Sequence, residues 1–250
     1  MKERAQGLGP RAEGRAPRRA AAGTELRVLV LGIGNILWAD EGFGVRCVEA
    51  MAATHRFGPN VTLLDGGTQG IYLVDQVREA DVLVVFDAVD YGLPSGTLKR
   101  VEGDAVPKFM GAKKMSLHQT GFQEVLAMAD LLGDYPEHLL LIGVQPVALE
   151  DFGGSLRPEV KARIAPAIEV ALDYLAALGV APLADAAPAP ADAELSQTAP
   201  HPALDLTAYE SGRPSPARAC RTGDERLLAR QLSQGVAHES ERPCSLEAGA

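Results

Sequence analysis

The sequence predicts a domain of the α/β class, a three-layer sandwich in which helices cover a five-stranded, mostly parallel sheet. Short apolar segments of strand length alternate with segments whose apolar residues recur at helical spacing. The strand segments are apolar on both faces, as in a parallel sheet that is buried on both sides. One connection between strands is too short to contain a helix, so the fourth strand is expected to run antiparallel to the third.

The expected strands are continuous apolar runs that end at glycine or at a polar residue. Residues 27–33 read RVLVLGI, and residues 81–87 read DVLVVFD. After the second of these runs, residues 92–96 read GLPSG, which is turn chemistry rather than a helical crossover. The strands are expected at residues 27–33, 61–65, 81–87, 97–102 and 139–144.

The expected helices have apolar residues three and four positions apart. In the first of them, Val45, Val48 and Met51 would share one face. The resulting order of elements is βαβαββαβα, which is typical of an α/β sandwich. The helices are expected at residues 41–56, 70–79, 118–133 and 157–178.

The folded unit is expected to be a single domain at residues 26–180, between two unlike tails. Residues 1–25 hold six basic and three acidic residues and are expected to form a disordered basic tail. The Arg18–Arg19 pair is similar to a twin-arginine signal, but a charged strand and a polar loop follow where an apolar segment should be. Residues 181–250 are rich in alanine and proline and are expected to be mostly disordered, with a short helix at 224–232 as one option.

Composition and charge exclude several classes of protein. The net charge is −9 and the pI is about 5.1, which argues against binding nucleic acid or an anionic membrane through bulk charge. No run of 18 or more apolar residues exists, so no membrane span is expected. The cysteines, Cys47, Cys220 and Cys244, lack metal-ligand spacing, and so sparse a set fits the reducing cytoplasm.

Three residues with metal-binding or acid–base chemistry are expected at one edge of the sheet, since ligands gather where parallel strands end. Glu41 follows the first strand, Asp87 ends the third, and His118 lies at the start of a helix. Asp87 follows four apolar residues, and a buried carboxylate is costly without a partner, a ligand or a metal. Together, two carboxylates and one imidazole suit a divalent cation such as nickel or zinc.

Other interpretations of these residues stay open at this point. The dipole of the helix that Glu41 begins would also stabilise this carboxylate, and Asp40 is expected to be the N-cap of that helix. A lone histidine such as His118 is more often structural than a ligand. Gly32 and Gly34 invite a dinucleotide site, but the third glycine of that motif is missing and two acids follow where a pyrophosphate would lie.

Five ordered motifs resemble the nickel–iron hydrogenase maturation endopeptidases. The motifs are LGIGNILWADEGFGVRCVEAM, LLDGGTQG, VVFDAVD, SLHQTGFQEVL and LIGVQP, and the match runs over residues 27–177. The resemblance implies a phosphorylase/hydrolase-like α/β fold with an antiparallel fourth strand. It also implies the activity, which is removal of a C-terminal peptide from the hydrogenase large-subunit precursor once nickel has been inserted.

The resemblance also implies roles for individual residues. The metal-binding positions of the family fall on Glu41, Asp87 and His118, which would bind the nickel already carried by the large subunit. The family is classed with aspartic-type endopeptidases, which would make Asp87 or Glu41 the catalytic base. The sequence does not decide between the two acids. No resident organic cofactor is implied, and the expected partner is the large-subunit precursor rather than nucleic acid or a membrane.

The segment after the second strand is expected to bind the backbone of the substrate. Glycine lets another backbone approach closely because it has no side chain. A tight turn between strand and helix would explain the glycine pair equally well. The expected substrate-binding residues are Gly66, Gly67 and Thr68.

Three rival functions follow from the same residues. A self-contained metallopeptidase would keep its own zinc at the three-residue site. A nickel-sensing maturation chaperone would bind the large subunit without cutting it. A dinucleotide-binding oxidoreductase would use the glycines after the first strand. The peptidase of hydrogenase maturation is the function that the five motifs favour.

Overall fold

A computed structural model describes residues 25–110, 117–184 and 204–212 of the chain. Five strands form one sheet in the order β2-β1-β3-β5-β4. β1, β2, β3 and β5 are parallel, and β4 is antiparallel to its neighbour β5. The predicted mostly parallel sheet with an antiparallel fourth strand is therefore confirmed. The strands are β1 (Val28–Ile33), β2 (Val61–Gly67), β3 (Val82–Ala88), β4 (Leu98–Glu102) and β5 (His138–Val144).

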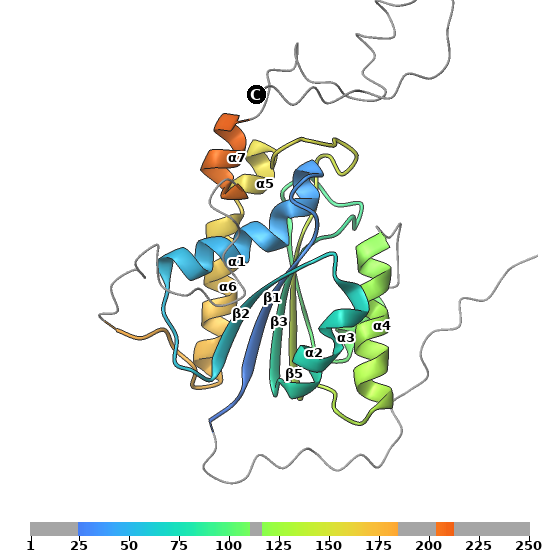
Figure 1. The fold of residues 1–250 in the computed structure, drawn as a ribbon, viewed down its shortest axis with the longest axis vertical. Coiled ribbons are helices and arrows are strands. Elements are labelled where there is room, and N and C mark those ends of the chain that lie inside the picture. The colour runs from blue at the N-terminus through green and yellow to red at the C-terminus, as the bar shows by residue number, and fades with distance from the viewer. Residues whose placement is uncertain (1–24, 111–116, 185–203, 213–250) are drawn as a thin grey trace, which may run out of the picture. The chain divides into compact units, whose positions relative to one another are not determined.

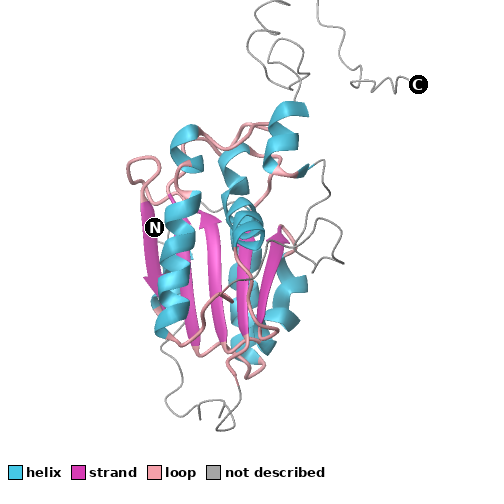
Figure 2. Ribbon diagram, turned by 90° about the vertical axis from the view of Figure 1, so that its left-hand side faces the viewer, coloured by secondary structure: helices cyan, strands magenta, loops and turns pink. Residues whose placement is uncertain are grey.

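Helices cover both faces of this sheet (Figures 1 and 2). α1 and α6 lie on one side of the sheet, and α2, α3 and α4 lie on the other (Figure 1). The helical elements are η1 (Ala39–Gly42), α1 (Phe43–Thr54), η2 (Gly70–Leu73), α2 (Val74–Glu79), α3 (Ala105–Met110), α4 (Leu117–Leu131), α5 (Pro158–Lys161), α6 (Ile164–Ala177) and α7 (Leu206–Gly212).

The core consists of two layers, because alternate residues of each central strand point to opposite faces. Along β3, Val82, Val84 and Phe86 belong to the layer under α1 and α6. Leu83 and Val85 belong to the layer under α2 and α4. All five are completely buried, which is why β3 reads as an unbroken apolar run rather than an alternating one.

Two helical features differ from the sequence prediction. The helix expected over residues 157–178 is two helices, α5 and α6, with a break at Ala162 and Arg163. Pro166 explains the break, because its ring would clash with the carbonyl group of Ala162 in a continuous helix. α7 lies in a segment that was expected to be mostly disordered.

The chain divides by contacts into residues 1–209 and residues 210–250, and only residues 210–212 of the second unit are described. The domain limits predicted from the sequence stay a prediction, and the helix considered at 224–232 lies outside the described residues. Within the described ranges, no helix is both long and apolar enough to cross a membrane.

Candidate functional site

Glu41 owes its position to two glycines that allow unusually close packing. Gly34 has φ 134°, and a side chain there would collide with the carbonyl oxygen of Glu41. A side chain on Gly44 would collide with the carbonyl oxygen of Phe86, on β3. η1, which carries Glu41, packs against β3 as a result. Gly44, together with Gly34, which is one of the two glycines that invited a dinucleotide interpretation, thus brings the start of α1 onto the strand ends.

Asp87 is the next-to-last residue of β3 and is completely buried. It pairs in register with Gly143 of β5. Because Gly143 has no side chain, the phenol of Tyr91 can lie over this position, where a Cβ would come within 2.6 Å of the hydroxyl oxygen. Tyr91 itself is fixed by Gln145, whose Oε1 accepts the backbone N–H of Tyr91 at 2.8 Å. The end of β3 is therefore closely packed around one buried acid.

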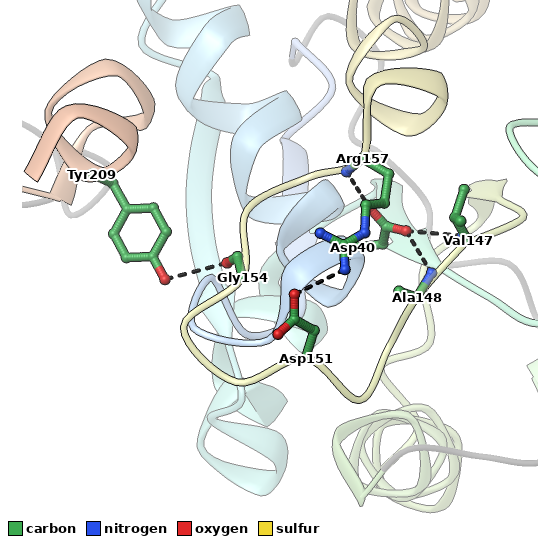
Figure 3. Close-up of polar contacts among 7 residues, drawn as sticks. All are labelled: Asp40, Val147, Ala148, Asp151, Gly154, Arg157 and Tyr209. Atoms are coloured by element: carbon green, nitrogen blue, oxygen red, sulfur yellow. Dashed lines mark hydrogen bonds and ion pairs between the residues drawn. The ribbon is translucent and has the colours of Figure 1, made fainter. Parts of the chain in front are cut away.

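Asp40, next to Glu41 in the sequence, has a structural role that differs from the predicted one. It lies inside η1, whose N-cap is Trp38, and the N-cap of α1 is Gly42. Instead, Oδ2 accepts the N–H groups of Val147 and Ala148 at 2.8 Å each, and Oδ1 accepts that of Arg157 at 2.7 Å (Figure 3). The prediction of an N-cap was wrong because these donors lie more than 100 positions away in the chain. Asp40 holds the segment after β5 against the loop that carries Glu41.

That segment pairs with the loop after β1 by two isolated bridges. Trp38 bridges to Phe152 and to Gly154. The rings of Trp38 and Phe152 meet edge to face, with centroids 5.3 Å apart. The backbone carbonyl oxygen of Trp38 accepts a hydrogen bond from the backbone N–H of Glu41 at 3.0 Å. The backbone of the site is thus braced from a distant part of the chain.

Burial raises the pKa of two acids at this edge, Glu41 and Asp65. It raises the pKa of Glu41 to about 7, so this carboxyl group exchanges its proton near neutral pH. Burial also raises the pKa of Asp65, at the end of β2, although a hydrogen bond from the Gly67 N–H opposes the shift. The pKa of Tyr91 is raised first by burial and then by the negative charge of Asp87. A carboxyl group that titrates near pH 7 is suited to general acid–base chemistry.

For His118, the third predicted metal ligand, the structure gives only the position in the helix. His118 lies in the first turn of α4, but its side chain is outside the described residues. Among the side chains that are described, no group of three His, Cys, Asp or Glu residues is arranged to hold a metal ion. The set of Glu41, Asp87 and His118 therefore stays a prediction, as do its roles.

The predicted substrate-binding segment has the geometry of a tight turn. Gly67 has φ 44°, a conformation that glycine adopts without strain. A Cβ on Gly66 would lie 2.7 Å from the side chain of Leu31. Thr68 is exposed. Backbone conformation accounts for Gly67 and packing accounts for Gly66, and binding of a substrate backbone by these residues stays a prediction.

Two residues at this edge were not singled out from the sequence. Asp65 lies in a place where aspartate is common, yet its burial near the end of β2 places a third carboxyl group near the strand ends. Tyr91 gave no signal, because nothing in the sequence shows that it packs over Gly143. The pairing of Asp87 with a glycine becomes visible only once the register of β3 and β5 is known.

Comparisons with known proteins agree on one family. Residues 45–174 match the family model of the hydrogenase maturation proteases. The hydrogenase expression/formation protein HupD of Thiocapsa roseopersicina is 68% identical over 216 residues, covering 84% of this chain and 96% of the relative. HoxM of Azotobacter vinelandii is 60% identical over 208 residues, covering 83% and 97%. The hydrogenase maturating endopeptidase HybD from Escherichia coli superposes with a TM-score of 0.60 at 38% identity, covering 63% of this chain and 97% of its own.

Proposed function

Since the chain belongs to the hydrogenase maturation protease family, and is therefore a peptidase, we propose that it removes the C-terminal peptide from the precursor of a nickel–iron hydrogenase large subunit. The observation that carries the proposal is the placement of Glu41 and Asp87. Both acids lie where parallel strands end, which is the edge at which α/β proteins bind their ligands. One is completely buried, and the pKa of the other is about 7.

The proposed recognition element is nickel that the large subunit already carries. Glu41, Asp87 and His118 would supply two oxygen ligands and one nitrogen ligand, a set that suits nickel. Because the ion arrives with the substrate, binding it reports that metal insertion is complete. It also anchors the precursor so that the peptide bond to be cut lies beside the carboxyl groups. No organic cofactor takes part in this proposal.

We assign the role of general base to Glu41, within an aspartic-type mechanism in which a carboxylate activates water. The carboxylate takes a proton from water, and the water oxygen attacks the carbonyl carbon of the scissile bond. The carbon–nitrogen bond then breaks, and the proton passes from Glu41 to the leaving amine. A pKa of about 7 suits both transfers, because neither protonation state is strongly favoured near neutral pH. Completely buried Asp87 would hold the metal and orient it.

The decisive experiment compares nickel-containing and nickel-free precursor as substrates of the same protease preparation. Mass spectrometry of the large subunit measures loss of the C-terminal peptide. The proposal expects cleavage of the nickel-containing precursor alone, by protease that has been treated with a chelator and desalted. Equal cleavage of both precursors would contradict recognition of nickel.

The same assay separates the rival functions. A chaperone that does not cut would leave the mass of the large subunit unchanged. A metallopeptidase with its own zinc would lose activity after chelation and regain it when zinc is added back. The proposal places the reaction in the cytoplasm, which agrees with the sparse cysteines of the chain.

A further inference from the structure

A short segment far beyond the sheet domain returns to cover a buried charge on α1. Arg46 is only 3% exposed. Its Nη1 donates to Glu49 Oε2 at 2.8 Å and to the backbone carbonyl oxygen of Leu204 at 2.7 Å. The guanidinium group also lies over the ring of Tyr209, with 5.6 Å between Cζ and the ring centroid. We call residues 204–209 the strap.

Burial of an arginine is unfavourable unless its charge is paired and its donors are satisfied. Glu49 supplies the charge, and the strap supplies a carbonyl acceptor and an aromatic face. Within the strap, Asp205 caps the start of α7 by accepting the N–H groups of Thr207 and Ala208 at 2.9 and 3.0 Å. The strap is therefore a folded element that completes the surroundings of α1.

The strap also contacts the segment after β5 that packs against the loop carrying Glu41. The hydroxyl group of Tyr209 donates to the carbonyl oxygen of Gly154 at 3.3 Å (Figure 3). Gly154 bridges to Trp38, and Trp38 accepts the backbone N–H of Glu41. We call residues 37–41 and 151–154 the rim. A continuous path of contacts thus joins the Tyr209 side chain to the backbone of the proposed base Glu41 through the rim.

The strap lies within the span that this chain shares with HupD of Thiocapsa roseopersicina. The match to HupD covers 84% of this chain, and a span of that length includes residue 205 wherever it begins. Nearly all of E. coli HybD, in contrast, corresponds to 63% of this chain, which is about the length of the sheet domain alone.

From these contacts we propose that the strap positions the rim for the substrate protein, with Arg46 and Tyr209 as positioning residues. Arg46 binds the strap to α1 through the carbonyl group of Leu204. The hydroxyl group of Tyr209 then binds Gly154, and Gly154 bridges to Trp38. The consequence for cleavage rests on the proposed function. The consequence for the rim does not, because the state of the rim can be measured without any substrate.

Trp38 gives that measurement, since it is the single tryptophan of the chain. Tyr209→Ala in the full-length protein is expected to shift the emission of Trp38 to the red and to increase its quenching by acrylamide. Tyr209→Phe keeps the ring over Arg46 and removes only the hydrogen bond to Gly154. It is expected to increase quenching while the melting temperature stays near that of the wild type.

Tyr174→Phe is the matched control. Tyr174 also lies under an arginine, Arg100, with the same 5.6 Å between Cζ and the ring centroid, but it does not belong to the rim. It should leave the emission and quenching of Trp38 unchanged. If both Tyr209 variants also leave them unchanged while Tyr209→Ala lowers the melting temperature, the strap merely stabilises α1, and the proposal is wrong.

Cleavage kinetics test the second half of the proposal. Loss of the Tyr209 hydrogen bond should raise KM for the precursor by about two- to tenfold, the weight of one hydrogen bond, with kcat unchanged. Tyr174→Phe should match the wild type. If the wild-type protein fails to cleave, the proposed function is wrong. The emission and quenching of Trp38 would still show whether the strap positions the rim. Wild-type kinetics in Tyr209→Phe would overturn the role in positioning for substrate.

Discussion

The two ends of β3 each have an aspartate, and the fold treats them in opposite ways. Asp81, just before the strand, accepts three hydrogen bonds from Arg27, from the backbone N–H at 3.0 Å, Nε at 3.0 Å and Nη2 at 2.7 Å. That ion pair is partly exposed to solvent. Asp87, at the other end, is completely buried beside Tyr91 and across from Gly143.

The difference shows that acids at the two edges of one sheet lie in different surroundings. At the edge where parallel strands begin, acids meet arginines, as in Asp81 with Arg27 and Asp134 with Arg78. At the edge where they end, burial raises the pKa of Glu41 and Asp65. An acid paired with arginine is held as a carboxylate, whereas a buried acid is ready to bind a cation or to move a proton.

The strongest test exchanges the acid at each end of β3 for its neutral isostere. Asp87→Asn is expected to reduce cleavage of the nickel-containing precursor by about 10²–10⁴-fold, because it removes a carboxylate from the reaction site. Circular dichroism should show a folded protein, since the side chain keeps its volume. Asp81→Asn is the matched control and should retain cleavage. Equal losses in both variants would contradict the separation of the two edges.

A second test concerns the adjacent acids Asp40 and Glu41. Asp40→Ala is expected to lower the free energy of unfolding by about 2–4 kcal/mol, because three backbone N–H groups lose a charged acceptor. Urea denaturation measures this value. A loss below about 1 kcal/mol would mean that water replaces the carboxylate at those N–H groups.

Glu41→Gln should have the opposite effect on stability. The pKa of Glu41 is raised to about 7 in the folded protein, from an ordinary value of 4.5, so the folded state holds this proton more tightly than the unfolded state does. Its contribution is therefore fully present below pH 4.5 and is lost as the pH rises through 7. At pH 8, Glu41→Gln is expected to be more stable than the wild type by about 1–2 kcal/mol, a value reduced because the group is partly solvated.

Denaturation of the two proteins at pH 5 and pH 8 checks this prediction. The gain from Glu41→Gln should shrink at pH 5, where the wild-type carboxyl group is itself protonated. Cleavage should be lost at both pH values, since the amide cannot serve as a base. A constant difference in stability between the two pH values would show that burial does not shift this pKa.

The smallest effect is expected from the ion pair at the opposite edge. Arg27→Gln should lower the free energy of unfolding by only about 0.2–1 kcal/mol, because half of the arginine side chain is exposed and solvent screens the pair. Cleavage should not change. Comparing the stability of the wild type and the variant in low and high salt shows how much of the ion-pair energy salt screens. A drop in cleavage would show that the two edges are coupled.

The sequence predicted the fold well, because the strands of a buried parallel sheet are continuous apolar runs. The short link after Asp87 also predicted the antiparallel β4, although not its pairing with β5 at the edge. The sequence did not reveal the break between α5 and α6, since one long apolar pattern spans both helices. Pro166 was the signal that would have shown it.

For the site, the sequence predicted which strand ends would bring Glu41 and Asp87 to one edge. It failed where a residue acts through a partner distant in the chain. Asp40 meets its donors after β5, and Tyr209 meets Arg46 across more than 150 positions. Local patterns such as capping and periodicity contain no information about contacts of this range. His118 as the third ligand stays a prediction.

Gly143 influences the surroundings of Asp87 although it is not itself one of the acids of the site. A single methyl group added there would lie 2.6 Å from the hydroxyl oxygen of Tyr91 and 3.0 Å from its ring, so the phenol would have to shift away from the strand end. The electrostatic surroundings of Asp87 would change although no charged residue had been altered. In evolution or in engineering, such a position lets the surroundings of an acid change while the set of acids remains the same.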